Sequence, residues 1–335
     1  MSIFISGAAG FIGFHTAMAL LARGERVVGL DNLNDYYDVA LKKARLAELE
    51  ANSSFEFHLA DITDRDAINH IVQTHGEIEG VAHLAAQAGA RYSLEDPFTY
   101  LHTNIEGQVA LLEACRNLKH LKHFVYASSS SVYGSNTEMP FTVDQKVERP
   151  TSVYAASKIS CELMANCYAH LYRIPVTGLR FFTVYGPWGR PDMAPMIFIR
   201  NILAGEPIQV FNNGQMTRDF TYIDDIVAGV VSCLDSPPLD GGSEPPANIY
   251  NLGNNQSEQL MTFVSVIERE LGAEAEIEYL PMQPGDVRET LADIEKSHAE
   301  LGFEPRISIE EGLPKLIAWY KDHYPERVIL KPKRK

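Results

Sequence analysis

The strongest constraint on the fold is a glycine-rich turn close to the N-terminus. Residues 3–5 are a short apolar run, as expected for a strand buried on both faces, and they enter a turn with the spacing GxxGxxG. A helical pattern follows to residue 23, and a second apolar run, residues 26–30, ends at Asp31. Strand, glycine turn, helix, strand and acid in this order are typical of a dinucleotide-binding βαβ unit, whose helix N-terminus faces a pyrophosphate.

The acid at the end of the second strand indicates which dinucleotide binds. Asp31 lies 21 residues after Gly10, where a carboxylate can hydrogen-bond the adenosine ribose hydroxyls and repel a 2′-phosphate. No arginine follows at once to receive such a phosphate, so we expect NAD rather than NADP. The residues expected to hold the cofactor are Gly7, Gly10, Phe11, Ile12, Gly13, Asp31, Asn32, Asp61, Ile62, Leu84, Ala85, Ala86, Tyr154 and Lys158.

Strand and helix patterns alternate through the first half of the chain. Further strands are expected at residues 55–59, 81–85, 124–126 and 176–179, with helices to residue 74 and at 97–118 and 152–172. This alternation predicts an α/β fold, a Rossmann-type doubly wound parallel sheet, with ligands at the carboxyl ends of the strands.

Beyond residue 181 the regular pattern loosens, because prolines break it into short elements. We therefore expect an NAD-binding domain over residues 1–181, to which residues of about 220–255 return. A smaller mixed α/β substrate-binding region, itself discontinuous, would occupy residues 182–330, followed by a basic tail at 331–335 that we read as solvated.

Composition excludes some classes of function. The net charge of −15 over 335 residues argues against a nucleic-acid binder, which needs lysine and arginine for the phosphate backbone. No apolar segment is long enough to span a bilayer, and the four cysteines form no CxxC pair and look like small buried side chains. The eleven histidines show no metal-ligand spacing, so no metal is expected, and the protein is expected to be cytoplasmic.

A tyrosine and a lysine four residues apart supply a candidate base. Tyr154 and Lys158 fall on one face of the helix expected at 152–172, so both can reach the same pocket. A free phenol has a pKa of about 10, and a nearby ammonium favours the phenolate. Such a pair is suited to taking a proton from a sugar or alcohol hydroxyl, provided that a dinucleotide site lies beside it.

These residues resemble the extended short-chain dehydrogenase/reductase family, and within it the nucleotide-sugar 4-epimerases. The resemblance covers nearly the whole chain, from the glycine turn through the serine run before Val132 to Arg218-Asp219-Phe220. Three stretches look like UDP-glucuronate 4-epimerases in particular. They are residues 31–38 (DNLNDYYD), 85–92 (AAQAGARY) and 183–193 (TVYGPWGRPDM).

The resemblance implies a mechanism of C4 epimerisation through a transient 4-keto sugar. Tyr154 would take the proton from O4, Ser129 would hydrogen-bond O4 and relay the proton, and Lys158 would hold the nicotinamide ribose. Because NAD is regenerated in every cycle, it is expected to stay tightly bound. The substrate would be a UDP-hexuronic acid, and the family pattern also implies a homodimer formed by the helices after Pro97 and around Tyr154.

The serine run separates an epimerase from its relatives in the family. Dehydratases and decarboxylases of this family carry a carboxylate beside the first catalytic hydroxyl, whereas this chain has Ser130 and Ser131 there. Epimerisation at C4 needs no acid or base at C5. Three alternatives stay open: an epimerase of another UDP-hexose, a UDP-sugar dehydratase or decarboxylase, and a non-catalytic NAD-binding regulator.

A glucuronate substrate needs donors around C6, because a 4-keto-hexuronate loses CO₂ readily unless its carboxylate is held out of alignment. The expected donors are Ser128, Ser130, Thr183 and Arg190. At the nucleotide end, the resemblance implies Arg218 and Arg288 on the diphosphate, Asp286 on the uridine ribose and Phe211 on uracil. Arg91, in the second of the three matching stretches, is also expected to bind substrate.

Overall fold

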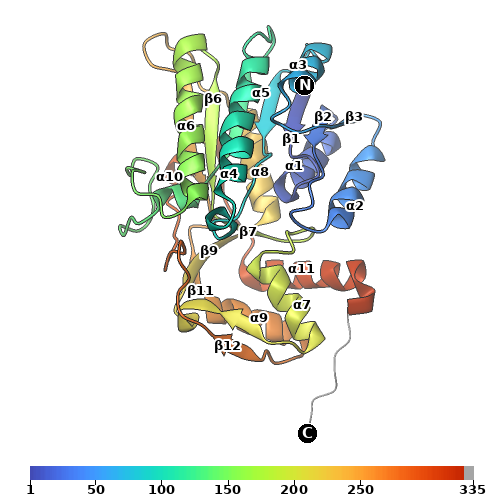
Figure 1. Cartoon of the computed structure of the whole chain (residues 1–335), viewed down its shortest axis with the longest axis vertical. Coiled ribbons are helices and arrows are strands. Elements are labelled where there is room, and N and C mark those ends of the chain that lie inside the picture. Colours follow the sequence, from blue (N-terminus) through green and yellow to red (C-terminus); the bar gives the residue numbers. More distant parts are fainter. Residues whose placement is uncertain (328–335) are drawn as a thin grey trace.

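The computed structural model describes residues 1–327, and its centre is a seven-stranded sheet in which every strand pairing is parallel. The strand order is β10-β6-β5-β4-β1-β2-β3, which confirms the predicted doubly wound sheet (Figure 1). The strands are β1 (Ser2–Ser6), β2 (Arg26–Asp31), β3 (Phe55–Leu59), β4 (Gly80–His83), β5 (His123–Ser129), β6 (Val176–Phe181) and β10 (Ala247–Leu252).

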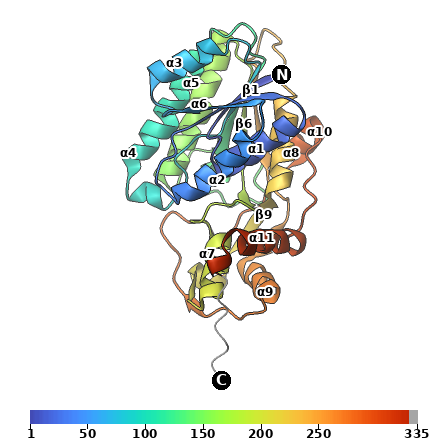
Figure 2. The same cartoon turned by 90° about the vertical axis from the view of Figure 1, so that its right-hand side faces the viewer.

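Helices cover both faces of this sheet, as Figure 2 shows. On one face α1 packs against α2 and α8, and on the other α3 packs against α5, which adjoins α6. These helices are α1 (Phe11–Ala22), α2 (Val39–Glu50), α3 (Arg65–Thr74), α4 (Pro97–Tyr100), the π-helical η2 (Leu101–Glu106), α5 (Gly107–Cys115), α6 (Val153–Tyr172), α8 (Ile223–Leu234) and α10 (Glu295–Leu301).

A smaller mixed region lies beyond the carboxyl ends of the strands (Figure 1). In it β9 pairs parallel with β7 and antiparallel with β11, while β8 pairs parallel with β12. Its elements are β7 (Thr183–Tyr185), α7 (Ala194–Ala204), β8 (Ile208–Val210), η4 (Phe211–Gly214), β9 (Thr217–Tyr222), β11 (Ser257–Gln259), α9 (Leu260–Leu271), β12 (Ile277–Tyr279), α11 (Ile309–His323) and η5 (Pro325–Arg327).

The apolar core runs without a break from the sheet into this smaller region. A single cluster of buried side chains includes Ile5 of β1, Leu20 of α1, Phe220 of β9 and Leu313 of α11. A second cluster, with Phe4 and Leu111, fills the space under α3 and α5. Strand β10 joins the main sheet and helix α8 packs on it, although both follow the first elements of the smaller region in the chain. The two regions therefore share their packing.

Several element boundaries differ from the sequence-based expectations. The helix expected over 97–118 ends at Cys115 and contains the π-helical turn η2, and α2 was not anticipated. The expectation of four buried cysteines is wrong for Cys167, which is exposed on α6. The expected basic tail, residues 331–335, lies outside the described residues. Within residues 1–327, none of the helices has the length and apolar character that crossing a bilayer requires.

Candidate active site

A continuous cleft of about 1190 Å³ opens along the carboxyl ends of the strands and reaches the smaller region. Its lining begins at Gly7, where β1 ends, and extends to Asp286. Strand order reverses between β1 and β4, and ligands of open α/β sheets bind outside such a switch point. The volume exceeds the roughly 300–1,000 Å³ of an ordinary small-molecule pocket, as expected for a site that takes two large ligands.

The glycine turn brings backbone, without side chains, to this switch point. A Cβ on Gly7 would lie 2.7 Å from the Ala85 backbone nitrogen, and Gly7 has a φ of +77°, a left-handed conformation that favours glycine. A Cβ on Gly13 would lie 2.0 Å from the Gly7 carbonyl oxygen. Helix α1 begins after Gly10 with no side-chain cap, so its first N–H groups face the cleft as an anion site.

Asp31 sits beside this turn at the end of β2, where only 7% of the residue is exposed. Its carboxylate accepts hydrogen bonds from the backbone N–H of Ala9 at 3.1 Å and of Leu33 at 2.9 Å. Burial raises the pKa of Asp31, while these N–H groups and the charge of Lys42 act in the opposite direction. Since each carboxylate oxygen accepts one of these bonds, each keeps a lone pair for a ribose hydroxyl.

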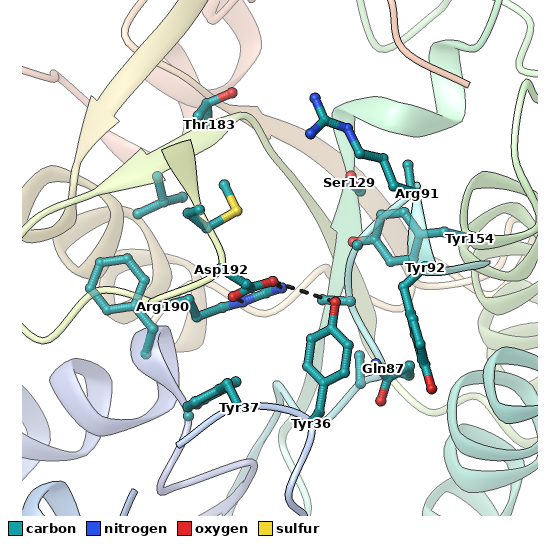
Figure 3. Close-up of a pocket in the computed structure, with 18 of the residues that line it drawn as sticks. Tyr36, Tyr37, Gln87, Arg91, Tyr92, Ser129, Tyr154, Thr183, Arg190 and Asp192 are labelled. Carbon is teal, nitrogen blue, oxygen red and sulfur yellow. Dashed lines mark hydrogen bonds and ion pairs between the residues drawn. The ribbon is translucent and has the colours of Figure 1, made fainter. Parts of the chain in front are cut away.

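Tyr154 and Lys158 lie on α6, Ser129 ends β5, and all three line the cleft. Figure 3 shows Tyr154 and Ser129 on the same side of it. Helix α6 starts where expected, because the Ser152 hydroxyl accepts a hydrogen bond from the Ala155 N–H. Lys158 is 4% exposed, and its Nζ donates to the Ala127 carbonyl at 2.8 Å, which fixes the ammonium against β5. The structure thus brings the predicted base, lysine and serine to one wall.

Asn104, which the sequence reasoning missed, ties this wall to the loop after β4. Its side chain accepts from the Gln87 N–H at 2.8 Å and donates to the Gln87 carbonyl at 3.0 Å and to the Ser157 hydroxyl at 2.9 Å. Asn104 lies in η2, and π-helical turns occur often at functional sites. The amide therefore positions α6 relative to the cofactor side of the cleft; no spacing in the sequence signals this contact.

A buried ion pair stands behind the serine run. Arg180 of β6 and Glu162 of α6 are joined by two hydrogen bonds, at 2.8 and 2.9 Å, and their side chains are 4% and 9% exposed. The Ser128 hydroxyl donates to the same carboxylate at 2.6 Å. Ser128 lines the cleft as expected, but its hydroxyl proton is committed to Glu162. The neighbouring Ser129 hydroxyl, within residues 1–327, accepts only from the Ser131 N–H.

Arg190 lies across the cleft from Tyr154 and Ser129 (Figure 3). Its guanidinium binds Asp192 in a two-pronged ion pair, with Nε 3.0 Å from Oδ1 and Nη2 2.5 Å from Oδ2. The same group lies over the ring of Tyr36, whose hydroxyl donates to Asp192 at 3.4 Å. The described contacts of Arg190 are therefore with this acid and ring, and Thr183, Ser128 and Ser130 are not among them.

Three of the residues expected at the nucleotide end, Phe211, Arg218 and Asp286, lie in the smaller region, and Arg91 reaches them from the loop before η1. Arg91 pairs with Asp286 at 2.9 Å and stacks over the Phe211 ring, with its guanidinium carbon 4.5 Å from the ring centroid. Arg218 donates to the Val287 carbonyl at 2.5 Å and to the Arg288 carbonyl at 3.0 Å, and burial lowers its pKa.

Two expected site residues are not among those lining the cleft. Asp61 is turned toward Asn32, whose amide donates to it at 2.7 Å, although its neighbour Ile62 does line the cleft. Arg288 has an exposed side chain, and only its backbone carbonyl meets Arg218. The other expected cofactor and substrate residues line the cleft, from Gly7 and Phe11 to Thr183.

The sequence reasoning also left out residues that line the cleft. They are chiefly Tyr36, Tyr37, Lys42, Gln87, Tyr92 and Asp192. By contrast, His83 of β4 is a core residue with a polar partner: it is buried and its Nδ1 lies 2.7 Å from the Ser6 hydroxyl. Burial, and to a smaller extent the charge of Lys158, lower the pKa of His83 to about 3, so this imidazole is neutral.

A dinucleotide-type glycine turn beside a helical Tyr–Lys pair, on a doubly wound parallel sheet, defines a member of the short-chain dehydrogenase/reductase class. A family model described as GDP-mannose 4,6 dehydratase matches residues 4–316. The chain belongs to the extended branch of that class, the family of NAD-dependent nucleotide-sugar epimerases and dehydratases.

Individual relatives are similar over nearly their whole length. A probable UDP-glucuronate 4-epimerase of Rhizobium meliloti (strain 1021) is 43% identical, with 97% of this chain and 98% of the relative covered. An uncharacterized 37.6 kDa protein of Escherichia coli O111:H- is 47% identical over 97% and 99%. The crystal structure of UDP-glucuronic acid 4-epimerase from Bacillus cereus, in complex with UDP-glucuronic acid and NAD, is 36% identical with a TM-score of 0.89, covering 97% and 100%.

Proposed function

We propose that this protein is a UDP-glucuronate 4-epimerase that converts UDP-glucuronate to UDP-galacturonate through a transient 4-keto sugar. The observation that carries the proposal is the wall formed by Tyr154, Lys158 and Ser129 at the cofactor side of the cleft, followed by Ser130 and Ser131 where a dehydratase or decarboxylase carries an acid. The relatives named as UDP-glucuronate 4-epimerases support the choice of substrate.

The residues at the switch point fit NAD. Side-chain-free backbone at Gly7, Gly10 and Gly13 gives the close approach that a pyrophosphate needs, and the Asp31 carboxylate would hydrogen-bond the adenosine ribose hydroxyls and repel a 2′-phosphate. The remainder of the cofactor side of the cleft would be lined by Phe11, Ile12, Leu84, Ala85 and Ala86. Bound NAD⁺ supplies the acceptor for the C4 hydride and, once reduced, returns that hydride to the sugar.

The chain's own residues would handle the proton at O4. Tyr154 accepts it as the base, and the nearby Lys158 ammonium, held by the Ala127 carbonyl, stabilises the phenolate. Ser129 donates a hydrogen bond to O4. The 4-keto sugar must then present its other face to this same wall, so the sugar turns while the nucleotide stays fixed.

The nucleotide end would be held by Arg91, Phe211, Arg218 and Asp286. Arg218 is half-buried and suits the diphosphate, since a guanidinium forks onto phosphate oxygens. Phe211 would pack against uracil, and Asp286 would accept from the uridine ribose. Arg91 pairs with Asp286 and stacks on Phe211, so these three side chains form one contact network at the nucleotide end. The role expected for Arg288 would need its exposed side chain to turn inward.

The C6 carboxylate would be held by hydroxyl donors first. Thr183 and Ser130 line the cleft, whereas the Ser128 hydroxyl is engaged by Glu162. Arg190 would contribute only if the substrate carboxylate competes with Asp192. Arg190→Ala should then abolish turnover of UDP-glucuronate while sparing a neutral UDP-hexose. If Arg190→Ala lowers kcat/KM equally for both substrates, Arg190 does not recognise the carboxylate.

A homodimer through α4 and α6 is part of the proposal. These helices pack side by side and expose large apolar side chains, with Phe98 77%, Leu163 62% and Leu171 65% exposed. Two copies of such a surface can form a self-complementary interface. Light scattering at micromolar protein should give twice the chain mass of 37.3 kDa, and a monomer mass would contradict the interface.

The first test is proton NMR of the purified protein with UDP-glucuronate and no added cofactor. New UDP-galacturonate signals support both the epimerase and a tightly bound NAD. Turnover only after NAD is added would keep the reaction and remove tight binding. A UDP-pentose product would indicate a decarboxylase. No reaction in either condition would favour another nucleotide sugar as the substrate.

The second test separates an enzyme from a non-catalytic NAD-binding regulator. Tyr154→Phe should lower kcat by about 10²–10⁴, the usual contribution of a general base, and leave the NAD content of the protein unchanged. Unchanged turnover in Tyr154→Phe with NAD still bound would favour the hypothesis of a non-catalytic NAD-binding regulator.

A further inference from the structure

A cluster of three potential metal ligands lies at the edge of the main sheet, away from the cleft. Glu56 and His58 belong to β3, which is the edge strand (Figure 1), and His75 immediately follows α3. In the sheet order, β2, β1 and β4 separate β3 from β5, which carries Ser129. None of the three residues lines the cleft, so the cluster has no part in the proposed epimerisation.

The three ligand atoms form a nearly equilateral triangle. His58 Nε2 lies 3.2 Å from His75 Nε2, and each of these nitrogens lies 3.3 Å from Glu56 Oε1. Zinc bonds to nitrogen or oxygen of about 2.0–2.1 Å, meeting at tetrahedral angles, place neighbouring ligand atoms about 3.3 Å apart. All three edges of the triangle therefore match one face of a tetrahedral zinc site.

Hydrogen bonds alone do not account for this arrangement. If both imidazoles donate from Nε2 to Glu56, their two N–H groups oppose each other across 3.2 Å. If instead one imidazole donates to the other, the accepting nitrogen turns its lone pair, and no proton, toward the carboxylate. A protonation state thus satisfies at most two of the three edges, whereas a cation inside the triangle satisfies all of them.

The surroundings orient the carboxylate and leave net negative charge. Arg26 donates to Glu56 Oε2 at 3.1 Å, which turns Oε1 toward the imidazoles, and it also pairs with Glu77 at 2.7 Å. Two carboxylates against one guanidinium give the site a formal charge of −1. The His75 Nδ1 lies 3.5 Å from that guanidinium and 3.8 Å from Glu77 Oε1. Glu77 is the acceptor of this pair, and it lies beyond hydrogen-bond distance of the proton that a metal-bound His75 would carry on Nδ1.

We propose that Glu56, His58 and His75 form a zinc site, with water at the fourth position. The donor set of two imidazoles and a carboxylate suits Zn²⁺, and the graded exposure of the ligands, with side chains 45%, 26% and 5% exposed, leaves one side of the triangle open to solvent. The ion would tie the edge strand to the end of α3. This proposal departs from the expectation of no metal, because the third ligand lies 17 residues from His58 on another element.

Zinc binding to the full-length, EDTA-treated and dialysed protein tests the proposal. Calorimetric titration with ZnCl₂ should give one ion per chain, and Co²⁺ should give the intense visible absorption of a tetrahedral site. His58→Ala and Glu56→Gln should each weaken zinc binding by more than about 100-fold, beyond the 10–100-fold that loss of an outer partner costs. The control is His120→Ala, which removes an exposed histidine outside the triangle.

Each result decides for or against the site. The zinc site is supported if the wild type and His120→Ala each bind one zinc per chain. The two ligand variants, His58→Ala and Glu56→Gln, should lose this zinc while their circular dichroism stays unchanged. No zinc bound by the wild type overturns it, and so does wild-type affinity in His58→Ala. Because the readout is metal binding, a failure of the epimerase proposal leaves this result unaffected.

Discussion

Replacing Glu162 by glutamine tests how the catalytic wall is held together. The carboxylate binds Arg180 through two hydrogen bonds of 2.8 and 2.9 Å and accepts the Ser128 proton at 2.6 Å, with the Arg180 side chain only 4% exposed. Burial alone would lower the pKa of Arg180, and the Glu162 carboxylate more than offsets this and raises it. Glu162→Gln removes the countercharge and turns an amide N–H₂ toward a guanidinium that has only donors.

The expected loss of stability is large. Breaking a buried ion pair from one side costs about 3–5 kcal/mol, because a charge stays buried without a partner, and whole domains are stable by only about 5–15 kcal/mol. Urea unfolding followed by circular dichroism, at pH 7.5 and with equal slopes for both proteins, measures the difference. Glu304→Gln is the control, since its pair with Arg306 is exposed on both sides and its loss should not move the midpoint.

A double variant makes the prediction refutable. Glu162→Leu with Arg180→Met replaces the pair by apolar side chains and should recover most of the stability lost in Glu162→Gln. The reasoning is wrong if Glu162→Gln lowers the free energy of unfolding by less than about 1 kcal/mol. It is also wrong if the double variant is less stable than Glu162→Gln, because the buried Arg180 charge would then not be the cause of the loss.

Three further predictions follow from the same structure. Gly7→Ala should reduce the NAD content of the purified protein sharply, because its Cβ would meet backbone at 2.7 Å. Gly24→Ala is the control and should retain NAD, since Gly24 has a similar φ of +81° and no atom of residues 1–327 lies within 4 Å of its added Cβ. Equal loss of NAD in both variants would contradict the steric argument. Asn104→Leu should cost about 1–3 kcal/mol in urea unfolding, since it leaves buried backbone groups without partners, and should lower kcat; an unchanged midpoint would refute it. Burial lowers the pKa of His15 from 6.5 to about 4, so the unfolded chain takes up the proton first and stability falls as pH drops from 6.5 toward 4, by up to about 3 kcal/mol. His15→Gln should flatten this slope in unfolding measured between pH 7.5 and 5, and an unchanged slope would assign the effect elsewhere.

Much of the fold follows from local patterns. The strand from residue 26 to Asp31 and the helix from Val153 to Tyr172 lie where the sequence placed them, because buried parallel strands read as apolar runs and Ser152 caps its helix. The π-helical turn at 101–106 was not predicted, and its residue Asn104 bonds a partner far along the chain, Ser157, which no local pattern signals.

The candidate site divides in the same way. The glycine spacing, the acid 21 residues on, and the Tyr–Lys pair are local, and the structure brings them to one cleft. Of the four serines in a row, only the family resemblance singles out Ser129 for the reacting oxygen. The fold commits the Ser128 hydroxyl to Glu162, a residue 34 positions away, whereas the described contact of the Ser129 hydroxyl within residues 1–327 is a bond that it accepts from the Ser131 N–H.

The sequence by itself determined the strand–helix alternation of the first half apart from α2, the dinucleotide turn and the helical face that carries Tyr154 and Lys158, because each depends on neighbours within a few residues. Only the tertiary structure decided that Tyr36 meets the Arg190–Asp192 pair, and that Arg91 joins Phe211 to Asp286. It likewise placed His75 against Glu56 and His58. The physical reason is that charge pairing and ligand geometry depend on distances between elements that the chain brings together only when it folds.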